Sequence, residues 1–424
     1  MMSSASVAAA VAEAHRREWA FVLAATVRLT GDIDLAEECV QDAYAQALGS
    51  WTASGVPDRP GAWLTTVARR GALNLLKRAA TERRTLPRLV EDRTDPGPEE
   101  IARVGPDEIP DDRLRLIFTC CHPTLSQPAQ VALTLRLLCG LTTSEVARAF
   151  LVADATMAAR ITRAKKKINA AGIPYRVPPV AELPERIDAV LEVVYLLYTT
   201  GHTAPAGADL VRRDLVERAL DLARMLHTLL PATELATTGA ADVAGLLALI
   251  LLTDARATTR VGPDGRAVLL AEADRTQWDR TAIAEGVSLV REALRRRPPG
   301  RFALMAAIAA VHDEAPSWAD TDWTEIVGLY DLLVTIWPSP VVALNRAVAI
   351  GYAHGPAAGL TALDALATEP QLAGYSYLAA SRAELLHRLG RLTEARLAYQ
   401  EALLLTENTV ELDFLTTRLG QLPD

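Results

Sequence analysis

The chain is poor in cysteine, lysine and aromatic residues, and it has no long hydrophobic run. Four cysteines among 424 residues, two of them adjacent, do not make a disulfide framework. The best apolar runs, 243–252 and 302–311, fall short of the ~20 residues that a membrane helix needs. No basic segment precedes an apolar stretch at the N-terminus, so no secretory signal is visible. We therefore expect a reduced, cytoplasmic protein.

Enzyme motifs are also missing. No lysine follows a glycine, which excludes a P-loop lysine, and neither G-x-G-x-x-G nor G-x-S-x-G occurs. The run Cys120-Cys121-His122 lacks a second ligand pair at zinc spacing, and Glu384 with His387 is only one half of a di-iron pattern. The sequence therefore predicts no enzyme, no metal site and no cofactor.

Charge is distributed unevenly along the chain. Residues 1–172 contain 22 basic and 20 acidic residues, whereas the rest contains 22 basic and 32 acidic residues. All four lysines lie in the first part. A slightly basic part joined to an acidic part indicates that only the first part meets a polyanion.

The apolar residues recur at helical spacing, and no convincing strand pattern appears, so we expect an all-α protein. The first helices are predicted over 7–30, 35–48 and about 62–84, with a breaker-rich loop over 49–61. Asp34 and Glu37 have the spacing of a capping box for the second helix. The third helix has an apolar stripe at Trp63, Val67, Gly71 and Leu75, with Leu64, Ala68 and Leu76 beside it.

Proline-rich segments divide the chain. Residues 85–110 are acidic and hold five prolines, which predicts a flexible linker, and residues 173–184 hold four more. We expect a first domain over 10–84, a second over 111–172 and a third over 185–424.

The strongest motif spans residues 141–168. Thr142 and Glu145 form a capping box for a short helix, and a tight connection over 151–154 leads to a second helix. This second helix has its core face at Met157, Ile161, Ala164 and Ile168. Five positive charges and no acid lie between Arg160 and Lys167. This pattern predicts a helix-turn-helix that enters a DNA major groove, although a helical hairpin with a solvated basic face would share it.

The helix at 62–84 is the second basic segment. Residues 69–88 hold seven basic residues and one acid, near Trp51 and Trp63. Such a surface suits single-stranded nucleic acid, although Trp63 by itself is better explained as a core residue. On the preceding helix, Glu37, Glu38, Gln41 and Asp42 form an acidic face, which is either solvated or a protein contact.

The C-terminal part contains a weak repeat. Residues 376–409 place Gly390, Ala395, Tyr399 and Ala402 at positions typical of a tetratricopeptide repeat. Gly355 precedes a similar helix about one repeat earlier. We therefore expect a tetratricopeptide-like helical-repeat domain with a surface for a protein or peptide partner, although an irregular helical bundle remains an alternative.

These motifs together resemble an extracytoplasmic-function sigma factor of bacterial RNA polymerase, over residues from about 10 to 172. Residues 36–51 are similar to the helix that docks on the polymerase clamp, and residues 63–78 to the segment that melts and reads the −10 element. The helix-turn-helix corresponds to the −35 reader. The remaining chain looks like the tetratricopeptide-like extension of one subgroup, a likeness carried by residues 330–349. This implies a transcription initiation factor regulated by its fused domain.

The resemblance also implies site residues. It implies promoter DNA contacts by Thr156, Ala159, Arg160, Arg163, Lys165, Lys166 and Lys167 in the helix-turn-helix, and by Arg69, Arg70, Asn74, Lys77 and Arg78 in the first domain. It implies contacts with core RNA polymerase by Glu37, Glu38, Gln41 and Asp42.

Two other functions stay open at this point. A helix-turn-helix regulator with a helical sensor domain would bind duplex DNA without polymerase, but it gives no role to the basic first domain. A helical metal- or cofactor-dependent enzyme would contain bound metal. For the C-terminal domain, we favour a scaffold that holds the two DNA-binding domains in an active arrangement over an acidic mask that competes with DNA.

Overall fold

A computed structural model describes residues 4–85, 112–150, 152–179, 182–204, 206–229, 239–295 and 298–422. Within these ranges the regular structure is helical, as the sequence predicts, apart from two strands of two residues each. The chain divides into two compact units, Met1–Val193 and Val194–Asp424. Over the described ranges, no helix has both the length and the apolar character required to cross a membrane. Almost all of the linker predicted over 85–110 lies outside the described residues.

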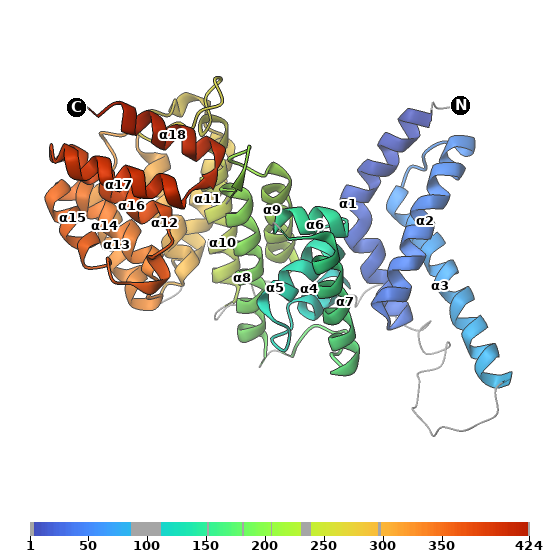
Figure 1. Ribbon diagram of the computed structural model, residues 1–424. Coiled ribbons are helices and arrows are strands. Elements are labelled where there is room, and N and C mark those ends of the chain that lie inside the picture. The colour runs from blue at the N-terminus through green and yellow to red at the C-terminus, as the bar shows by residue number, and fades with distance from the viewer. Residues whose placement is uncertain are drawn as a thin grey trace. The chain divides into compact units, whose positions relative to one another are not determined.

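The first unit opens with three helices that pack against one another pairwise (Figure 1). They are α1 (Ser4–Thr30), α2 (Ile33–Ser54) and α3 (Pro60–Thr85). The side chain of Asp32 caps α2 by accepting a hydrogen bond from the Leu35 amide at 3.0 Å, so the predicted capping box of Asp34 and Glu37 is wrong. The helix also continues past Gly49, because Trp51 on its last turns is buried and extends the apolar face.

The core face of α3 is centred beside the predicted stripe, on Leu64 and Ala68, which the sequence already places next to it, and on Ala72. Leu64, Ala68 and Ala72 are fully buried, whereas the predicted stripe from Trp63 to Leu75 is only partly buried. Alanine at two of the three buried positions allows the helices to approach closely, since the distance between packed helices depends on the side chains at the contact. Large side chains such as Trp63 therefore lie at the edge of this core.

Four short helices and a π-helical turn complete the first unit before the chain enters α8. They are α4 (Asp112–Cys120), α5 (Gln127–Leu133), η2 (Thr134–Leu138), α6 (Thr143–Ala149) and α7 (Asp154–Ala170). The helix α8 (Leu183–His202) begins in the first unit and ends in the second.

Over its described residues, the second unit is mainly a succession of helices. These are α9 (Arg213–Leu229), α10 (Gly239–Asp254), η3 (Ala257–Thr259), η4 (Arg275–Gln277), α11 (Arg280–Ala293), α12 (Arg301–Glu314), α13 (Trp323–Ile336), α14 (Pro340–Ala353), α15 (Pro356–Asp364), η5 (Pro370–Leu372), α16 (Ser376–Arg388), α17 (Leu392–Leu405) and α18 (Thr409–Gly420). Helices adjacent in the sequence pack against each other along most of this series, which is how repeat domains bury their apolar faces.

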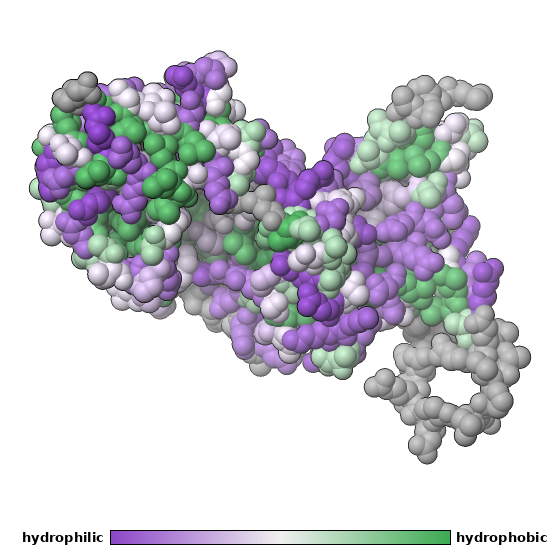
Figure 2. Space-filling model, viewed as in Figure 1, coloured by the Kyte–Doolittle hydropathy of each residue, from purple (hydrophilic) through white to green (hydrophobic). Residues whose placement is uncertain are grey.

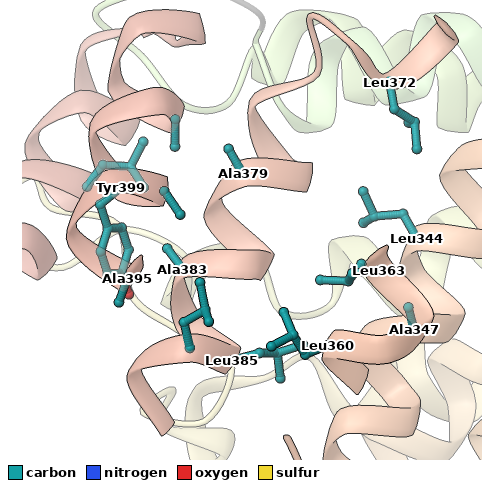
Figure 3. Packing of buried hydrophobic residues seen from close by; sticks show 14 of the residues in the cluster. Leu344, Ala347, Leu360, Leu363, Leu372, Ala379, Ala383, Leu385, Ala395 and Tyr399 are labelled. Atoms are coloured by element: carbon teal, nitrogen blue, oxygen red, sulfur yellow. The ribbon is translucent and has the colours of Figure 1, made fainter. Parts of the chain in front are cut away.

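The predicted repeat over 376–409 is a hairpin of α16 and α17. Gly390 forms the turn with φ of +73°, a conformation that favours glycine. The predicted knobs Ala395, Tyr399 and Ala402 are buried, which confirms this helical pair. Figure 3 shows Tyr399 and Ala395 in the same apolar cluster as Leu385, Leu360 and Leu344 from the preceding helices.

A short parallel strand pair joins the beginning and end of the second unit. Strand β1 (Ala206–Gly207) pairs with β2 (Glu407–Asn408). Asn408 is fully buried, and its Nδ2 donates to the carbonyl oxygens of Ala204 at 3.1 Å and Asp209 at 2.9 Å. Its Oδ1 accepts from the amide of Val410 and caps α18. One asparagine therefore links two segments 200 residues apart in the sequence.

The surface of the second unit carries hydrophobic residues among the polar ones. Figure 2 shows green hydrophobic patches between purple residues over the C-terminal helices. On α17, Leu397 is 62% exposed and Leu404 is 88% exposed. Scattered exposed leucines are normal on a protein surface, so these residues alone define no site.

Candidate nucleic-acid and polymerase interfaces

The helix-turn-helix forms as its sequence predicts. The Thr142 hydroxyl accepts from the Glu145 amide at 3.2 Å, and the Glu145 carboxylate accepts from the Thr142 amide at 2.6 Å, which confirms the capping box. The core face of α7 is also confirmed, because its buried residues are Met157, Ile161, Ala164 and Ile168. Burying this face turns the opposite side of α7 outward.

The outward side of α7 holds most of the DNA-contact residues implied by the resemblance. Five of them are exposed, and they are Thr156, Ala159, Arg163, Lys166 and Lys167. Arg160 is half-buried. The Arg163 Nε donates to the Ala159 carbonyl at 3.1 Å, which holds this guanidinium along the helix. The Lys167 ammonium donates to the Thr124 carbonyl.

Lys165 differs from its neighbours on α7. Its Nζ lies 2.6 Å from Asp34 Oδ1 and also forms an ion pair with Glu37, and its side chain is only 12% exposed. Burial alone would lower the pKa of Lys165, but Glu37 and Asp34 outweigh burial and hold this pKa above its ordinary value. Lys165 is therefore a charged group held against α2.

The residues implied on α3 lie together on one exposed face. Arg69, Arg70, Asn74, Lys77 and Arg78 are all exposed. Nearby, Trp51 is buried and Trp63 is partly buried, with ring centroids 5.7 Å apart in an edge-to-face arrangement. The two tryptophans thus contribute to the core of the helical bundle, while the cationic row faces solvent.

The acidic residues implied on α2 fall into two groups. Glu38, Gln41 and Asp42 are exposed. Glu37 is 6% exposed and lies between two cations, because its Oε1 is 2.7 Å from Arg136 Nη2 and its Oε2 pairs with Lys165. The acidic face of α2 is thus split between solvent and the helices η2 and α7.

The contact between α1–α2 and the helix-turn-helix domain extends beyond this cluster. The Trp19 indole donates to the Leu137 carbonyl at 3.0 Å, and Gly140 packs against the same indole. At the other end of the contact, the Tyr175 hydroxyl lies 3.0 Å from the Ala24 carbonyl oxygen. The two helical bundles of the first unit are therefore joined through both polar and aromatic side chains.

Comparison with known families matches three parts of the chain. The description "Sigma-70 region 2" matches residues 15–82 and "Sigma-70, region 4" matches residues 115–168. A "Family of unknown function (DUF6596)" matches residues 186–294. The probable ECF RNA polymerase sigma factor SigI of Mycobacterium tuberculosis is 30% identical over 171 residues, which are 40% of this chain and 58% of SigI.

The chain is an extracytoplasmic-function sigma factor with a fused C-terminal domain. The uncharacterized protein R00370 of Rhizobium meliloti (strain 1021) belongs to the same family, with 39% identity over 401 residues that cover 94% of this chain and 93% of R00370. The similarity to R00370 therefore includes the C-terminal domain, whereas SigI shares a shorter part.

Membership in this family defines the general role of the sigma factor. Region 2 corresponds to α1–α3 and region 4 to α4–α7. The sigma-70 regions make the chain a transcription initiation factor that binds DNA, rather than an enzyme, and they imply core RNA polymerase and promoter DNA as partners.

The cysteines of the sigma factor are all buried and free. Burial raises the pKa of Cys121 to about 12, and the hydrogen bond with Thr134 does not offset this effect. Among the described residues, no group of three His, Cys, Asp or Glu side chains is placed to hold a metal ion.

Sequence reasoning missed three residues that join regions 2 and 4 of this sigma factor. They are Trp19, Arg136 and Tyr175. Each contacts a partner far away in the sequence, and the local pattern around each residue gives no sign of that partner.

Proposed function

We propose that this sigma factor brings core RNA polymerase to promoters and that its C-terminal domain regulates initiation. The proposed division is a region 2 domain over 10–84, a linker over 85–110, a region 4 domain over 111–172 and a tetratricopeptide-like domain over 185–424. The proposed place of action is the cytoplasm. The observation that carries this proposal is that the two sigma-70 regions each present exposed basic residues on one helix, α3 in region 2 and α7 in region 4.

The helix α7 is proposed to read the −35 element. Its capped, buried opposite face supports insertion of the outward face into a major groove. Arg160 and Arg163 have the side chain that recognises guanine most often, through two hydrogen bonds. Lys166 and Lys167 are suited to phosphate contacts, which position the helix without reading sequence.

The helix α3 is proposed to recognise and melt the −10 element. Its exposed row of Arg69, Arg70, Lys77 and Arg78 offers charge to the phosphates of separated strands, and Asn74 offers an amide to a base edge. The burial of Trp51 makes this residue unsuitable as a stacking surface, whereas Trp63 keeps part of its ring accessible.

The exposed residues Glu38, Gln41 and Asp42 on α2 are proposed to contact core polymerase. Charged residues at such a surface steer association and fix the orientation of the partners. Glu37 belongs to the same proposed surface, although its carboxylate is engaged with Arg136 and Lys165 in the free chain.

The C-terminal domain is proposed to act as a scaffold with a protein or peptide partner. A cavity of about 300 Å³ opens among α14, α16, α17 and α18. Its lining is mainly apolar and includes Tyr352, Tyr377 and Phe414, and at one side Arg418 pairs with Glu384. A mainly apolar cavity with a few polar groups is the usual form of a binding site.

An assay of binding to core polymerase distinguishes the proposed function from that of a polymerase-independent regulator. The purified chain is titrated with core polymerase, and the complex is tested on duplex and on pre-melted promoter DNA. The proposal predicts a stable complex that binds pre-melted DNA more tightly than the free chain does. Equal DNA binding with and without polymerase would instead support the polymerase-independent regulator.

The two hypotheses for the C-terminal domain predict opposite effects of its removal on transcription. A chain that ends at Val193 keeps the whole first unit, including the Arg186 side chain that donates to the Phe118 carbonyl. The scaffold hypothesis predicts loss of transcription from this truncated chain, whereas an acidic mask predicts a gain. Transcription equal to that of the full chain would contradict both.

A further inference from the structure

A second cavity in the C-terminal domain has cations rather than aromatic rings in its lining. It has a volume of about 220 Å³ and is lined by the carboxyl ends of α8 and α10, by η3 and its flanks, and by residues 268–273. The polar residues of the lining are His202, Thr253, Arg256, Thr259 and Arg260. The apolar residues are Val268, Leu270 and Ala273.

The charge of this cavity is opposite to that of the chain around it. From residue 173 onward the sequence contains 22 basic and 32 acidic residues. Two arginines line the cavity, and none of the described residues in its lining carries a carboxylate. The whole lining falls within residues 186–294, the segment matched by the family of unknown function. The positive charge is therefore a property of this site and not of the acidic domain as a whole.

Arg260 is held in place by neutral oxygen atoms. Its Nη1 donates to the His202 carbonyl, and its Nη2 donates to the Thr203 hydroxyl at 3.0 Å. Because His202 ends α8, the guanidinium lies at the carboxyl end of a helix, where a cation is favourable. Arg260 is half-buried and forms no ion pair with any residue that the structure describes. It therefore brings a fixed and partly desolvated positive charge to the cavity.

Two further arginines lie close by. The side chain of Arg256 is 12% exposed, and its Nε lies 3.2 Å from Oδ1 of the fully buried Asp313. Arg275 is 8% exposed and donates to the carbonyl oxygens of His312 and Ala315 at 2.6 and 2.8 Å. Over the described ranges, Asp313 is the carboxylate that forms an ion pair with one of these three arginines. Poorly exposed charges are costly unless they are paired, so a bound anion would be stabilised here.

The imidazole of His202 responds to the same excess of positive charge. Burial lowers the pKa of His202 to about 3, and Arg260, Arg256 and Arg213 contribute to this lowering. A site whose cations disfavour a further cation favours an anion for the same electrostatic reason. The neutral ring has its Nδ1 2.9 Å from the Tyr198 hydroxyl oxygen.

We propose that this cavity binds a small organic oxyanion, a phosphate ester or a carboxylate, through the guanidinium groups of Arg256 and Arg260. The planar guanidinium fork matches both head groups. The apolar residues of the lining favour an organic anion over a bare inorganic ion, because apolar surface gains free energy when it is buried. The site has no lining residue in common with the apolar cavity of α14 to α18, so this ligand is additional to the proposed protein or peptide partner.

Calorimetric titration of the full-length chain tests the proposal with three probes. They are inorganic phosphate, phenyl phosphate and benzoate, each at an ionic strength held constant with chloride. We expect saturable binding at one site, and phenyl phosphate should bind severalfold more tightly than inorganic phosphate because its ring contacts the apolar lining. The tighter of phenyl phosphate and benzoate identifies the head group.

Two variants change the cavity by different routes. Arg260→Gln removes the charge but keeps a donor for the His202 carbonyl. Ala273→Glu adds a carboxylate to the lining and leaves both arginines in place, so failure of the first variant to fold leaves the second. Each should weaken binding about tenfold or more, because hydrogen bonds and ion pairs with charged groups are the strong ones. The matched controls are Arg266→Gln and Ala271→Glu, two exposed positions outside this lining, and both should keep the parent affinity.

Two results would overturn the proposal. One is the absence of saturable binding of all three probes to the parent chain. The other is binding that Arg260→Gln and Ala273→Glu both retain with the parent affinity. Neither result bears on the association with core polymerase, so the proposed function is tested separately.

Discussion

The two basic helices of this sigma factor, α3 and α7, differ in whether their charged side chains face solvent or contact another helix. On α3, the five residues implied as DNA contacts are exposed on one face. On α7, five of the seven implied residues are exposed and Arg160 is half-buried, but Lys165 is held by Asp34 and Glu37 of α2. A run of positive charge in a sequence can therefore combine two roles, because Lys165 and Lys167 make contacts within the chain, whereas Lys166 is exposed and is proposed to contact DNA.

Among the substitutions, the largest expected effect on stability comes from removing the carboxylate of Glu37. Glu37→Ala leaves Arg136 and Lys165 poorly exposed and without their shared carboxylate. Breaking a buried pair by removing one partner costs roughly 3 kcal/mol of unfolding free energy, and some solvent exposure of the two cations places the loss at the lower end of measured values. Denaturation of the first unit, followed by its tryptophan fluorescence, measures this change.

The matched control for this variant is Glu38→Ala, the exposed neighbour on the same helix. Exposed charges contribute little to stability, so Glu38→Ala should change the unfolding free energy by less than about 0.5 kcal/mol. Similar losses for both variants would mean that the ion pairs of Glu37 with Arg136 and Lys165 have no special role in stability.

The next effect concerns the proposed DNA contacts of α7 and α3. Replacing Arg160 and Arg163 together with alanine should weaken binding of the polymerase complex to its promoter by about tenfold or more, since each bidentate arginine–guanine contact discriminates by roughly 1–3 kcal/mol. Replacing Lys77 and Arg78 of α3 should leave binding to an isolated −35 duplex unchanged and reduce promoter melting. Mobility shifts and permanganate reactivity measure these two properties, and an exchange of the two phenotypes would contradict the assignment of the helices.

The features of the fold that the sequence predicts correctly depend on residues close together in the chain. The capping box of Thr142 and Glu145 and the core face of α7 depend on spacings within a few residues, and both are confirmed. The end of α2 depends instead on the burial of Trp51 in a core made by three helices, so a rule based on Gly49 placed it too early. The engagement of Lys165 with Glu37 links residues 128 positions apart, and no pattern within either helix encodes that contact.

An effect of pH, rather than of a substitution, separates the two units. Burial lowers the pKa of His202 and of His312 to about 3, and nearby arginines add to this effect. Because the folded pKa lies below the unfolded value of about 6.5, each histidine should reduce stability as pH falls from about 6.5 towards 3, by up to about 1.4 kcal/mol per pH unit. Burial raises the pKa of Asp313 to about 6, so between about pH 4 and pH 6 this group offsets part of the loss.

We therefore expect the second unit to lose stability between pH 6.5 and pH 4. The contact between Lys165 and Glu37 should not weaken through Lys165 in this range, because the raised pKa keeps the ammonium charged. Thermal unfolding as a function of pH, compared between the parent and a His202→Gln variant, measures the histidine contribution. An unchanged pH dependence in this variant would exclude His202 as its source.

The smallest effect concerns the exposed part of α2. Asp42→Arg reverses a charge on the proposed polymerase-binding surface and leaves the ion pairs of Glu37 with Arg136 and Lys165 in place. A charge at the rim of an interface acts mainly on the association rate, so we expect about a threefold to tenfold slower association at low salt and a smaller difference at high salt. Glu401→Arg on α17 is the control, and equal rates for the two variants would remove Asp42 from the interface.

The central claim is that this chain gives core RNA polymerase its promoter specificity. Run-off transcription tests it most directly, with core polymerase alone and with the full chain on promoter fragments selected by the complex from random DNA. The account predicts specific run-off products only when the chain is present, and their loss with the Arg160→Ala, Arg163→Ala variant. Absence of specific products, while the chain still binds duplex DNA without polymerase, would contradict the claim.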